Sequence, residues 1–276
     1  MVLRVGEVEH PVRTAQTLRP VGDHTPLEKF LSALVVTAVV VGFIWLSFRR
    51  AGVEVNIHTV WEYRRRWVDG FIGTVVISLG ALVLSLVLGS LTAAASRSRV
   101  LILRYFASFY VQLIRSTPLL VQIYVFFYVI GTAWGLDNRY VMGILILSIF
   151  EGAYIAEIIR GGWQSIEGQT YEIARAIALT PAQTFRLVTL PILLSRTVPA
   201  LAGQFASIIK DSSLLSVIAV IELTQTTQEI SAENFQMFAN YLLLAALYFV
   251  LTFAVSLVSK ALERRLGRAF ADQRTA

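Results

Sequence analysis

Three ionisable residues stand inside otherwise apolar sequence: Glu151, Lys210 and Asp211. Glu151 and Lys210 each lie about 15 Å into their apolar stretches at 1.5 Å per helical residue, which is near the middle of a bilayer. An unpaired charge at that depth costs several kcal/mol, so such residues are typical of solute pathways. A carboxylate suits a substrate ammonium group, whereas lysine or serine suits a substrate carboxylate. The candidate translocation residues are Glu151, Lys210, Asp211, Ser212, Ser213, Gln122 and Gln204.

Two structural alternatives accompany this interpretation. Glu151 and Lys210 could neutralise each other as a buried pair. Gln122 and Gln204 could serve only as hydrogen-bonding contacts between helices. Glu157 and Arg160, three residues apart, are expected to form a structural ion pair rather than a binding site.

Six apolar stretches are expected to position these residues as membrane-spanning helices. Hydrophobic residues make up 56% of the chain and charged residues 15%, against about 25% charged in soluble domains. Each stretch approaches the roughly 20 residues that a spanning helix needs and far exceeds a barrel strand. The expected spans are 30–48, 71–95, 118–134, 141–159, 199–223 (interrupted at 210–213) and 241–258. For the third span, the alternative is an earlier start in the apolar and amphipathic stretch from Tyr105. The fold class is therefore an all-α integral membrane protein.

Several chemistries are excluded by the residues present. The chain has no cysteine, so it can form neither a disulfide nor a thiolate metal site. The histidines, His10, His24 and His58, all lie outside the expected spans and form no catalytic motif. None of the three lysines follows a glycine, so a phosphate-binding P-loop is absent. The net charge of +6 comes from arginines that flank apolar spans, which favours membrane topology over nucleic-acid binding. No cleavable signal peptide is expected in the polar first 29 residues.

A polar island separates two hydrophobic segments at residues 169–191. Residues 169–178 have the spacing of a short amphipathic helix. Thr180, Pro181 and Gln183 then predict a second helix start, with a threonine cap, a first-turn proline and a capping-box glutamine. The sequence therefore predicts a helix, a sharp turn and another helix.

Glu172, Ala174, Val188, Leu190 and Pro191 give this island a pattern that resembles the EAA loop of ABC-importer permeases, so we call residues 169–191 the EAA-like loop. Glu172, Ala174, Leu190 and Pro191 match that motif in register, whereas Val188 replaces isoleucine and Ile173 replaces an alanine. Ala178 stands where the family has glycine. If the backbone there is left-handed, alanine costs roughly 1 kcal/mol relative to glycine.

Residues 67–266 as a whole resemble the permease domain of the polar-amino-acid importers, the histidine and glutamine permeases. The matching segments are 70–99 (with Thr74 and Gly89), 115–122 (RSTPLLVQ), 152–157 (GAYIAE), 160–162 (RGG), 204–205 (QF), 210–214 (KDSSL) and 216–218 (SVI). The resemblance implies a five-helix type I core with one additional N-terminal helix. Glu151 departs from the family, which usually has a small or amide residue there, so substrate specificity cannot be carried over.

The resemblance also implies partners and roles. This chain would be one of two permeases, either a second copy or a paralogue, served by an extracytoplasmic amino-acid-binding protein. ATP and magnesium would be bound by a partner ATPase dimer, and this chain would hold no cofactor and catalyse no reaction. The residues expected to transmit force from the ATPase are Glu172, Ala174, Arg175, Ala178, Thr180, Pro181 and Phe185. The alternative is a proton-coupled secondary transporter, which would not need the EAA-like loop.

Arginine and lysine placement predicts the orientation. With both termini on the cytoplasmic side of a bacterial inner membrane, the inner segments hold most of the basic residues, and the expected outer loop 224–240 holds none. Arg64, Arg65 and Arg66 then face outside, against this trend, where they could help to receive the binding protein. The alternative for these arginines is contact with lipid headgroups. The expected divisions are a cytoplasmic tail 1–29, an extra helix 30–48, an extracytoplasmic segment 49–69, the permease domain 70–266 and a cytoplasmic tail 267–276.

Overall fold

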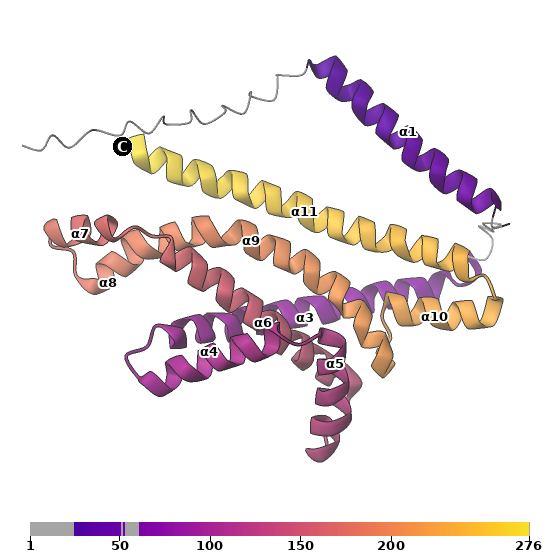
Figure 1. Cartoon of the computed structure of the whole chain (residues 1–276), viewed down its shortest axis with the longest axis horizontal. Coiled ribbons are helices and arrows are strands. Elements are labelled where there is room, and N and C mark those ends of the chain that lie inside the picture. Colours follow the sequence, from indigo (N-terminus) through magenta and orange to yellow (C-terminus); the bar gives the residue numbers. More distant parts are fainter. Residues whose placement is uncertain (1–24, 51, 53–60, 276) are drawn as a thin grey trace, which may run out of the picture. The chain divides into compact units, whose positions relative to one another are not determined.

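The structure, a computed structural model, describes residues 25–50, 52 and 61–275, with side chains as far as residue 261. All regular elements within these ranges are helices (Figure 1). The chain divides into two units, 1–54 and 55–276. The described part of the first unit contains α1 (Pro26–Arg50), an apolar helix that buries none of its residues. It contains the expected span 30–48.

The second unit is built around two long helices, α3 (Arg64–Ser96) and α6 (Arg139–Gln164). Small side chains let them approach closely, as is usual between membrane helices. A Cβ atom on Gly89 would lie 2.5 Å from Ile155 Cγ2, and one on Gly152 would lie 3.2 Å from Leu88 Cβ. Any larger residue at either glycine would therefore force these helices apart. Expected spans 71–95 and 141–159 lie within these two helices.

The third expected span is broken rather than straight. Helix α4 (Leu101–Arg115) and the run formed by α5 (Leu119–Tyr124) and the π-helix η1 (Val125–Gly131) meet at a 108° bend. Pro118 causes the break, because proline disfavours a helical conformation in the residue before it. The span 118–134 alone omits α4, the first limb of the bent pair, so the alternative of an earlier start from Tyr105 is closer to the structure.

The fifth expected span is longer than predicted. A helical run extends from Pro181 to Ile218 through α8 (Pro181–Gln183), the π-helix η2 (Thr184–Thr189), α9 (Leu190–Asp211) and the 3₁₀-helix η3 (Ser212–Ile218). Pro199 lies inside α9 and does not begin it, so the boundary 199–223 is wrong at both ends. The interruption expected at 210–213 is present, since the α-helix gives way to 3₁₀ geometry at Ser212.

The segment expected as an outer loop, 224–240, contains helix α10 (Leu223–Asn234). The buried carboxylate of Glu222 caps it by accepting hydrogen bonds of 2.7 Å from the backbone N–H groups of Thr224 and Gln225. Helix α11 (Met237–Thr275) follows and runs on through most of the expected tail 267–276. The sixth expected span, 241–258, lies within it.

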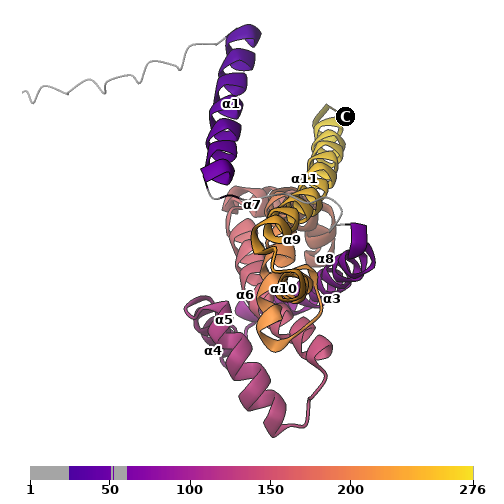
Figure 2. The same ribbon diagram turned by 90° about the vertical axis from the view of Figure 1, so that its right-hand side faces the viewer.

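The described residues contain five helices long and apolar enough to cross a bilayer, or six if the bent pair counts as one span. Helices α3, α9 and α11 run lengthwise, with α7 (Gly168–Ala176) and α8 at one end of the second unit and α10 at the other (Figure 1). The view along the long axis shows α5 turning sharply away from α4 (Figure 2). The expected all-α class with about six spans is therefore confirmed.

Candidate functional site

A buried polar cluster joins α6 to α9. Glu151 is fully buried, and its Oε2 atom accepts a hydrogen bond from Nε2 of Gln204. The carboxyl group of Asp211, at the last residue of α9, lies within interaction range of Glu151. The other Glu151 oxygen, Oε1, has no hydrogen-bond partner among the described residues. The structure thus brings together three of the predicted residues, with one buried acceptor left unsatisfied.

Lys210 is not part of this cluster. Its side chain is exposed, and no ion pair among the described residues joins it to Glu151. The alternative of a buried Glu151–Lys210 pair is therefore not the arrangement observed. The neighbouring Ser212 is buried and donates a hydrogen bond of 2.8 Å to the carbonyl of Ile209. Ser213 is half-buried, and its carbonyl accepts a hydrogen bond from Ser216.

Gln122 occupies the corner between α4 and α5. Its Nε2 atom donates hydrogen bonds to the carbonyl of Ile114 at 2.8 Å, to the hydroxyl of Thr117 at 2.7 Å and to the Thr117 carbonyl at 3.1 Å. These bonds satisfy backbone groups that the break at Pro118 releases. The structure therefore places Gln122 as a brace of the bend, with its hydrogen bonds made to Ile114 and Thr117.

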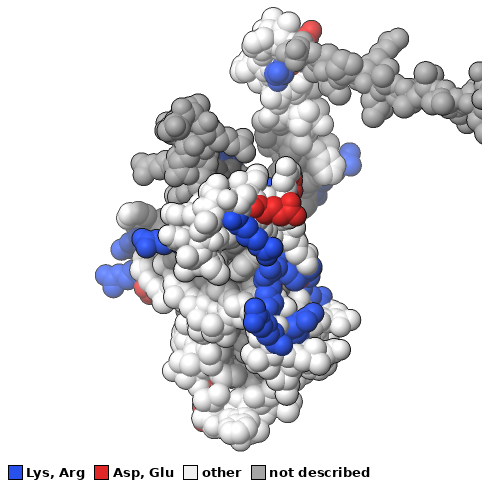
Figure 3. Space-filling model, turned by 90° about the vertical axis from the view of Figure 1, so that its left-hand side faces the viewer, with Lys and Arg blue, Asp and Glu red and all other residues white. Residues whose placement is uncertain are grey.

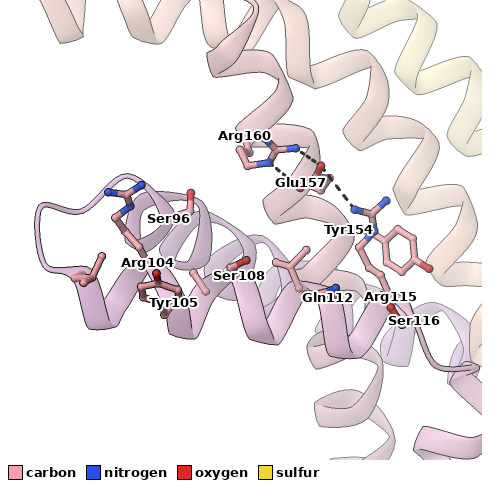
Figure 4. A pocket seen from close by; sticks show the side chains of 13 residues that line it. Ser96, Arg104, Tyr105, Ser108, Gln112, Arg115, Ser116, Tyr154, Glu157 and Arg160 are labelled. Carbon is pink, nitrogen blue, oxygen red and sulfur yellow. Dashed lines mark hydrogen bonds and ion pairs between the residues drawn. The ribbon is translucent and has the colours of Figure 1, made fainter.

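A groove of about 830 Å³ lies between α4 and α6, and we call it the α4–α6 groove (Figure 4). On the α6 side, Arg160 binds the Glu157 carboxylate with two nitrogens, which confirms the expected ion pair. Nη1 of Arg115 lies 3.7 Å from the same carboxylate, and its guanidinium lies 5.2 Å from the ring centre of Tyr154. The residues lining the groove are Ser96, Leu101, Arg104, Tyr105, Ala107, Ser108, Val111, Gln112, Arg115, Ser116, Tyr154, Glu157 and Arg160.

This groove was not predicted from the sequence, although a polar pattern that indicates it is present in α4. Arg104, Ser108, Gln112 and Arg115 recur at helical spacing and form one polar stripe along α4. That stripe was part of a stretch recognised only as amphipathic.

The EAA-like loop folds as predicted, into helix α7, a sharp reversal and a second helical run that starts at α8. Ala178 adopts the left-handed conformation with a φ of 56°, so the chain accepts the cost of alanine there. Thr180 caps the second helix: its hydroxyl accepts from the Gln183 N–H at 3.3 Å, and the Gln183 side chain accepts from the Thr180 N–H at 2.9 Å. Pro181 lies in the first turn. The predicted capping box is confirmed.

The loop presents an exposed and mostly apolar surface. Ile173, Ile177, Phe185 and Leu187 are 45% to 66% exposed, whereas Ala174 is buried. Glu172 and Arg175 are both exposed, and no ion pair joins them among the described residues. Exposed apolar groups gathered in a polar rim are typical of protein-binding surfaces.

The loop is held against the body of the molecule by aromatic contacts. The Phe185 and Trp163 rings lie 6.1 Å apart, and the Arg97 guanidinium lies 4.4 Å from the Trp163 ring centre. Lysine and arginine dominate this end of the molecule, with few acidic residues in view (Figure 3). The exposed arginines of segments 97–99 and 165–196 are Arg97, Arg99, Arg175, Arg186 and Arg196.

At the opposite end, α3 is tied to α10. Arg66 lies 3.0 Å from a Glu229 oxygen and 2.6 Å from a Glu233 oxygen. Nearby, burial raises the pKa of Glu222 to about 7, against the hydrogen bonds it accepts from Thr224, Gln225 and Tyr248. Arg66 therefore pairs with residues of its own chain. The sequence predicted only a contact of Arg66 with a binding protein or with lipid headgroups.

Comparison with known proteins gives independent evidence about the family of this chain. Residues 85–268 match the family model described as binding-protein-dependent transport system inner membrane component. The chain is 36% identical to the L-cystine transport system permease protein TcyB of Bacillus subtilis (strain 168), over 72% of this chain and 86% of that one. It is 34% identical to the glutamine transport system permease protein GlnP of Escherichia coli (strain K12), over 75% of this chain and 95% of that one.

A solved structure agrees with these sequence relatives. The crystal structure of an amino acid ABC transporter with histidines contains a chain that superposes with a TM-score of 0.72 at 31% identity. The match covers 77% of this chain and the whole of the other. The proton-coupled alternative gains no support from any of these relatives.

Proposed function

This chain belongs to the inner membrane components of binding-protein-dependent transport systems, the permease subunits of ABC importers, and we propose that it imports polar amino acids. Members of this family do not hydrolyse ATP themselves, because a separate subunit does so. The relatives named for L-cystine and glutamine support an amino-acid substrate. The observation that carries the proposal is the EAA-like loop, which folds as a helix, a left-handed turn at Ala178 and a capped second helix.

In the proposed complex, this loop docks on an ATPase dimer that binds ATP and magnesium. Its exposed apolar side chains would be covered by the ATPase, and Glu172 and Arg175, which lack a mutual ion pair, would find partners there. Two permeases, identical or paralogous, would enclose the path, and an extracytoplasmic binding protein would deliver the substrate. The loop and both termini would lie in the cytoplasm of a bacterium, consistent with the arginine-rich end.

The Glu151 cluster is the proposed passage point within the membrane. Two carboxyl groups, from Glu151 and Asp211, and the Gln204 amide meet where α9 changes from α to 3₁₀ geometry. Irregular backbone at membrane depth is tolerated only where protein or a water-filled cavity surrounds it. The unsatisfied Glu151 oxygen could accept a hydrogen bond from a substrate ammonium group. Lys210, being exposed in this chain, would face the path or the second permease.

The test is ATPase stimulation in a reconstituted complex. The chain would be co-expressed with the ABC ATPase and binding protein of its own genome and placed in nanodiscs, and ATP hydrolysis would be measured against a panel of twenty amino acids. We expect one or a few polar amino acids to stimulate hydrolysis several-fold when the binding protein is present. Equal hydrolysis with every amino acid, or failure to co-purify with any ATPase, would contradict the proposal.

A further inference from the structure

The α4–α6 groove gathers the polar side chains of α4, the first limb of the bent span. Along α4 the polar stripe Arg104, Ser108, Gln112 and Arg115 faces the groove (Figure 4). On the opposite side of the same helix, Ile102, Phe106, Phe109 and Leu113 are 49% to 74% exposed. In a bilayer the apolar side meets lipid, and the polar side must meet water or protein.

The groove carries an excess of positive charge. Three of its lining residues are arginines, Arg104, Arg115 and Arg160, and a single glutamate, Glu157, faces them. That glutamate is already engaged by two of the arginines. The guanidinium of Arg104 has no hydrogen bond, ion pair or aromatic contact with any residue that the structure describes. The contact of Arg115 with Glu157, at 3.7 Å, is too long for a hydrogen bond, so its N–H groups also remain available.

Arginine N–H groups form a planar fork that matches a carboxylate or a phosphate. The other lining residues are both polar and apolar, so the groove can hold a charged group and an apolar part of the same solute. They are Ser96, Ser108, Gln112 and Ser116 with Leu101, Tyr105, Ala107, Val111 and Tyr154. The groove also lies beside the last two turns of α6 before the EAA-like loop, through Glu157 and Arg160. It therefore opens toward the end of the molecule that we assign to the cytoplasm.

We propose that the α4–α6 groove binds the α-carboxylate of the transported amino acid, on Arg104, at the cytoplasmic side of the path. This inference rests on the proposed function and adds to it a second binding station, distinct from the Glu151 cluster. Because every amino acid has an α-carboxylate, the groove would recognise amino acids as a class. At the other station, the Glu151 cluster, Glu151 and Asp211 would bind the ammonium group. A volume of about 830 Å³ is far larger than one amino acid, as expected of an exit vestibule.

The experiment uses the permease–ATPase complex in nanodiscs without its binding protein, so that only sites on the membrane part are measured. L-glutamine, L-histidine and L-arginine, each with its α-amide, are titrated while binding is followed by saturation-transfer NMR. The amide keeps the side chain and has a neutral carboxamide of similar size in place of the carboxylate. For the acid that the complex transports, we expect the wild type to bind the acid about tenfold more tightly than the amide, which is typical of one charge-assisted contact.

The variants then assign the contact. Arg104→Gln should remove the preference for the acid, and Arg104→Lys should retain part of it because the charge remains without the fork. Arg115→Gln is the second variant, and it should keep the preference because Arg115 lies about three helical turns from Arg104 and contacts Glu157 and Tyr154 instead. Arg99→Gln is the matched control: Arg99 is an exposed arginine near the same end, outside the groove, and its loss should leave binding unchanged. The inference fails if acid and amide bind the wild type equally, or if Arg104→Gln keeps the preference.

Two other occupants give different results. If the groove holds a lipid phosphate, Arg104→Gln should reduce co-purified phosphatidylglycerol and leave acid binding intact, which would overturn the proposal. If it contacts the second permease, Arg104→Gln should break the complex on size-exclusion chromatography, which would also overturn it. Failure of the proposed function is separately visible, because the wild-type complex would then show neither amino-acid-stimulated ATPase activity nor uptake.

Discussion

The side-chain amide of Gln204 in α9 donates a hydrogen bond to the fully buried carboxylate of Glu151 in α6, across 53 residues of sequence. This bond fixes which oxygen of Glu151 is occupied and leaves Oε1 without a partner. Helix α9 therefore carries both groups that surround Glu151, the Gln204 amide and the Asp211 carboxyl.

Exchanging the carboxylate of Glu151 with the amide of Gln204 tests whether Glu151 binds the substrate or only Gln204. Glu151→Gln should lower uptake at least about tenfold, because an amide cannot neutralise a substrate ammonium group. The double variant Glu151→Gln with Gln204→Glu restores an amide–carboxylate pair with the two groups exchanged. We expect uptake by the double variant to stay low although the complex assembles and its basal ATPase activity survives. Recovery of uptake in the double variant would make the pair a scaffold and reject the substrate role.

Charge reversal in the EAA-like loop tests docking on the ATPase. Glu172→Lys should reduce both uptake and substrate-stimulated ATP hydrolysis severalfold, because it places the wrong charge at the proposed contact, and membrane insertion should be normal. The control is Glu167→Lys, an equally exposed residue at the start of α7 whose side chain makes no capping hydrogen bond. Equal effects of the two variants, or normal coupling in Glu172→Lys, would count against the docking role of Glu172.

The left-handed Ala178 gives a prediction about loop stability. Ala178→Gly should raise the free energy of local opening by up to about 1 kcal/mol, since glycine adopts a positive φ without steric cost. Ala176→Gly, two residues earlier within α7, should lower it by about 1 kcal/mol. Hydrogen exchange of the Leu179 amide, which bonds the Ala174 carbonyl at 3.0 Å, reports both changes. Changes of the same sign would show that residue 178 is not left-handed in the protein.

Orientation is tested by labelling single cysteines in a chain that has none of its own. Arg65→Cys should react with an impermeant maleimide added outside intact cells, whereas Ile177→Cys should react only after the membrane is permeabilised. Both side chains are exposed, so access depends on the side of the membrane and not on burial. A cysteine at residue 60 would extend the test to a position outside the described residues. Labelling of Ile177→Cys from outside would invert the assigned topology.

The sequence predicted those parts of the fold that depend on local chemistry. Thr180, Pro181 and Gln183 predicted a helix start because a cap, a first-turn proline and a capping box act within four residues. The α to 3₁₀ change at Ser212 was likewise foreshadowed by four polar residues in an apolar run. The start of the fifth span was predicted wrongly at Pro199. In a sequence, a proline inside a membrane helix looks like a proline at a helix start.

Features that depend on tertiary contacts could not be predicted from the sequence. Glu151 and Lys210 lie at similar depths, yet depth does not fix direction around the helix, and the structure pairs Glu151 with Gln204 instead. The 108° bend at Pro118 is braced by Gln122, which reaches back to the Ile114 carbonyl, a contact that no periodicity shows. Helix α10 was missed because its composition is polar and its stability comes from Glu222, Arg66 and packing on α3.

The proposed function is tested most directly by identifying the energy source of transport. Proteoliposomes containing the permease–ATPase complex, oriented with the ATPase inside, would receive radiolabelled L-glutamine, L-histidine or L-arginine together with the binding protein. The account predicts accumulation of at least one of them only when ATP and magnesium are enclosed, unaffected by an imposed proton gradient. Uptake that follows a proton gradient without ATP, and that persists when the ATPase is omitted, would contradict it.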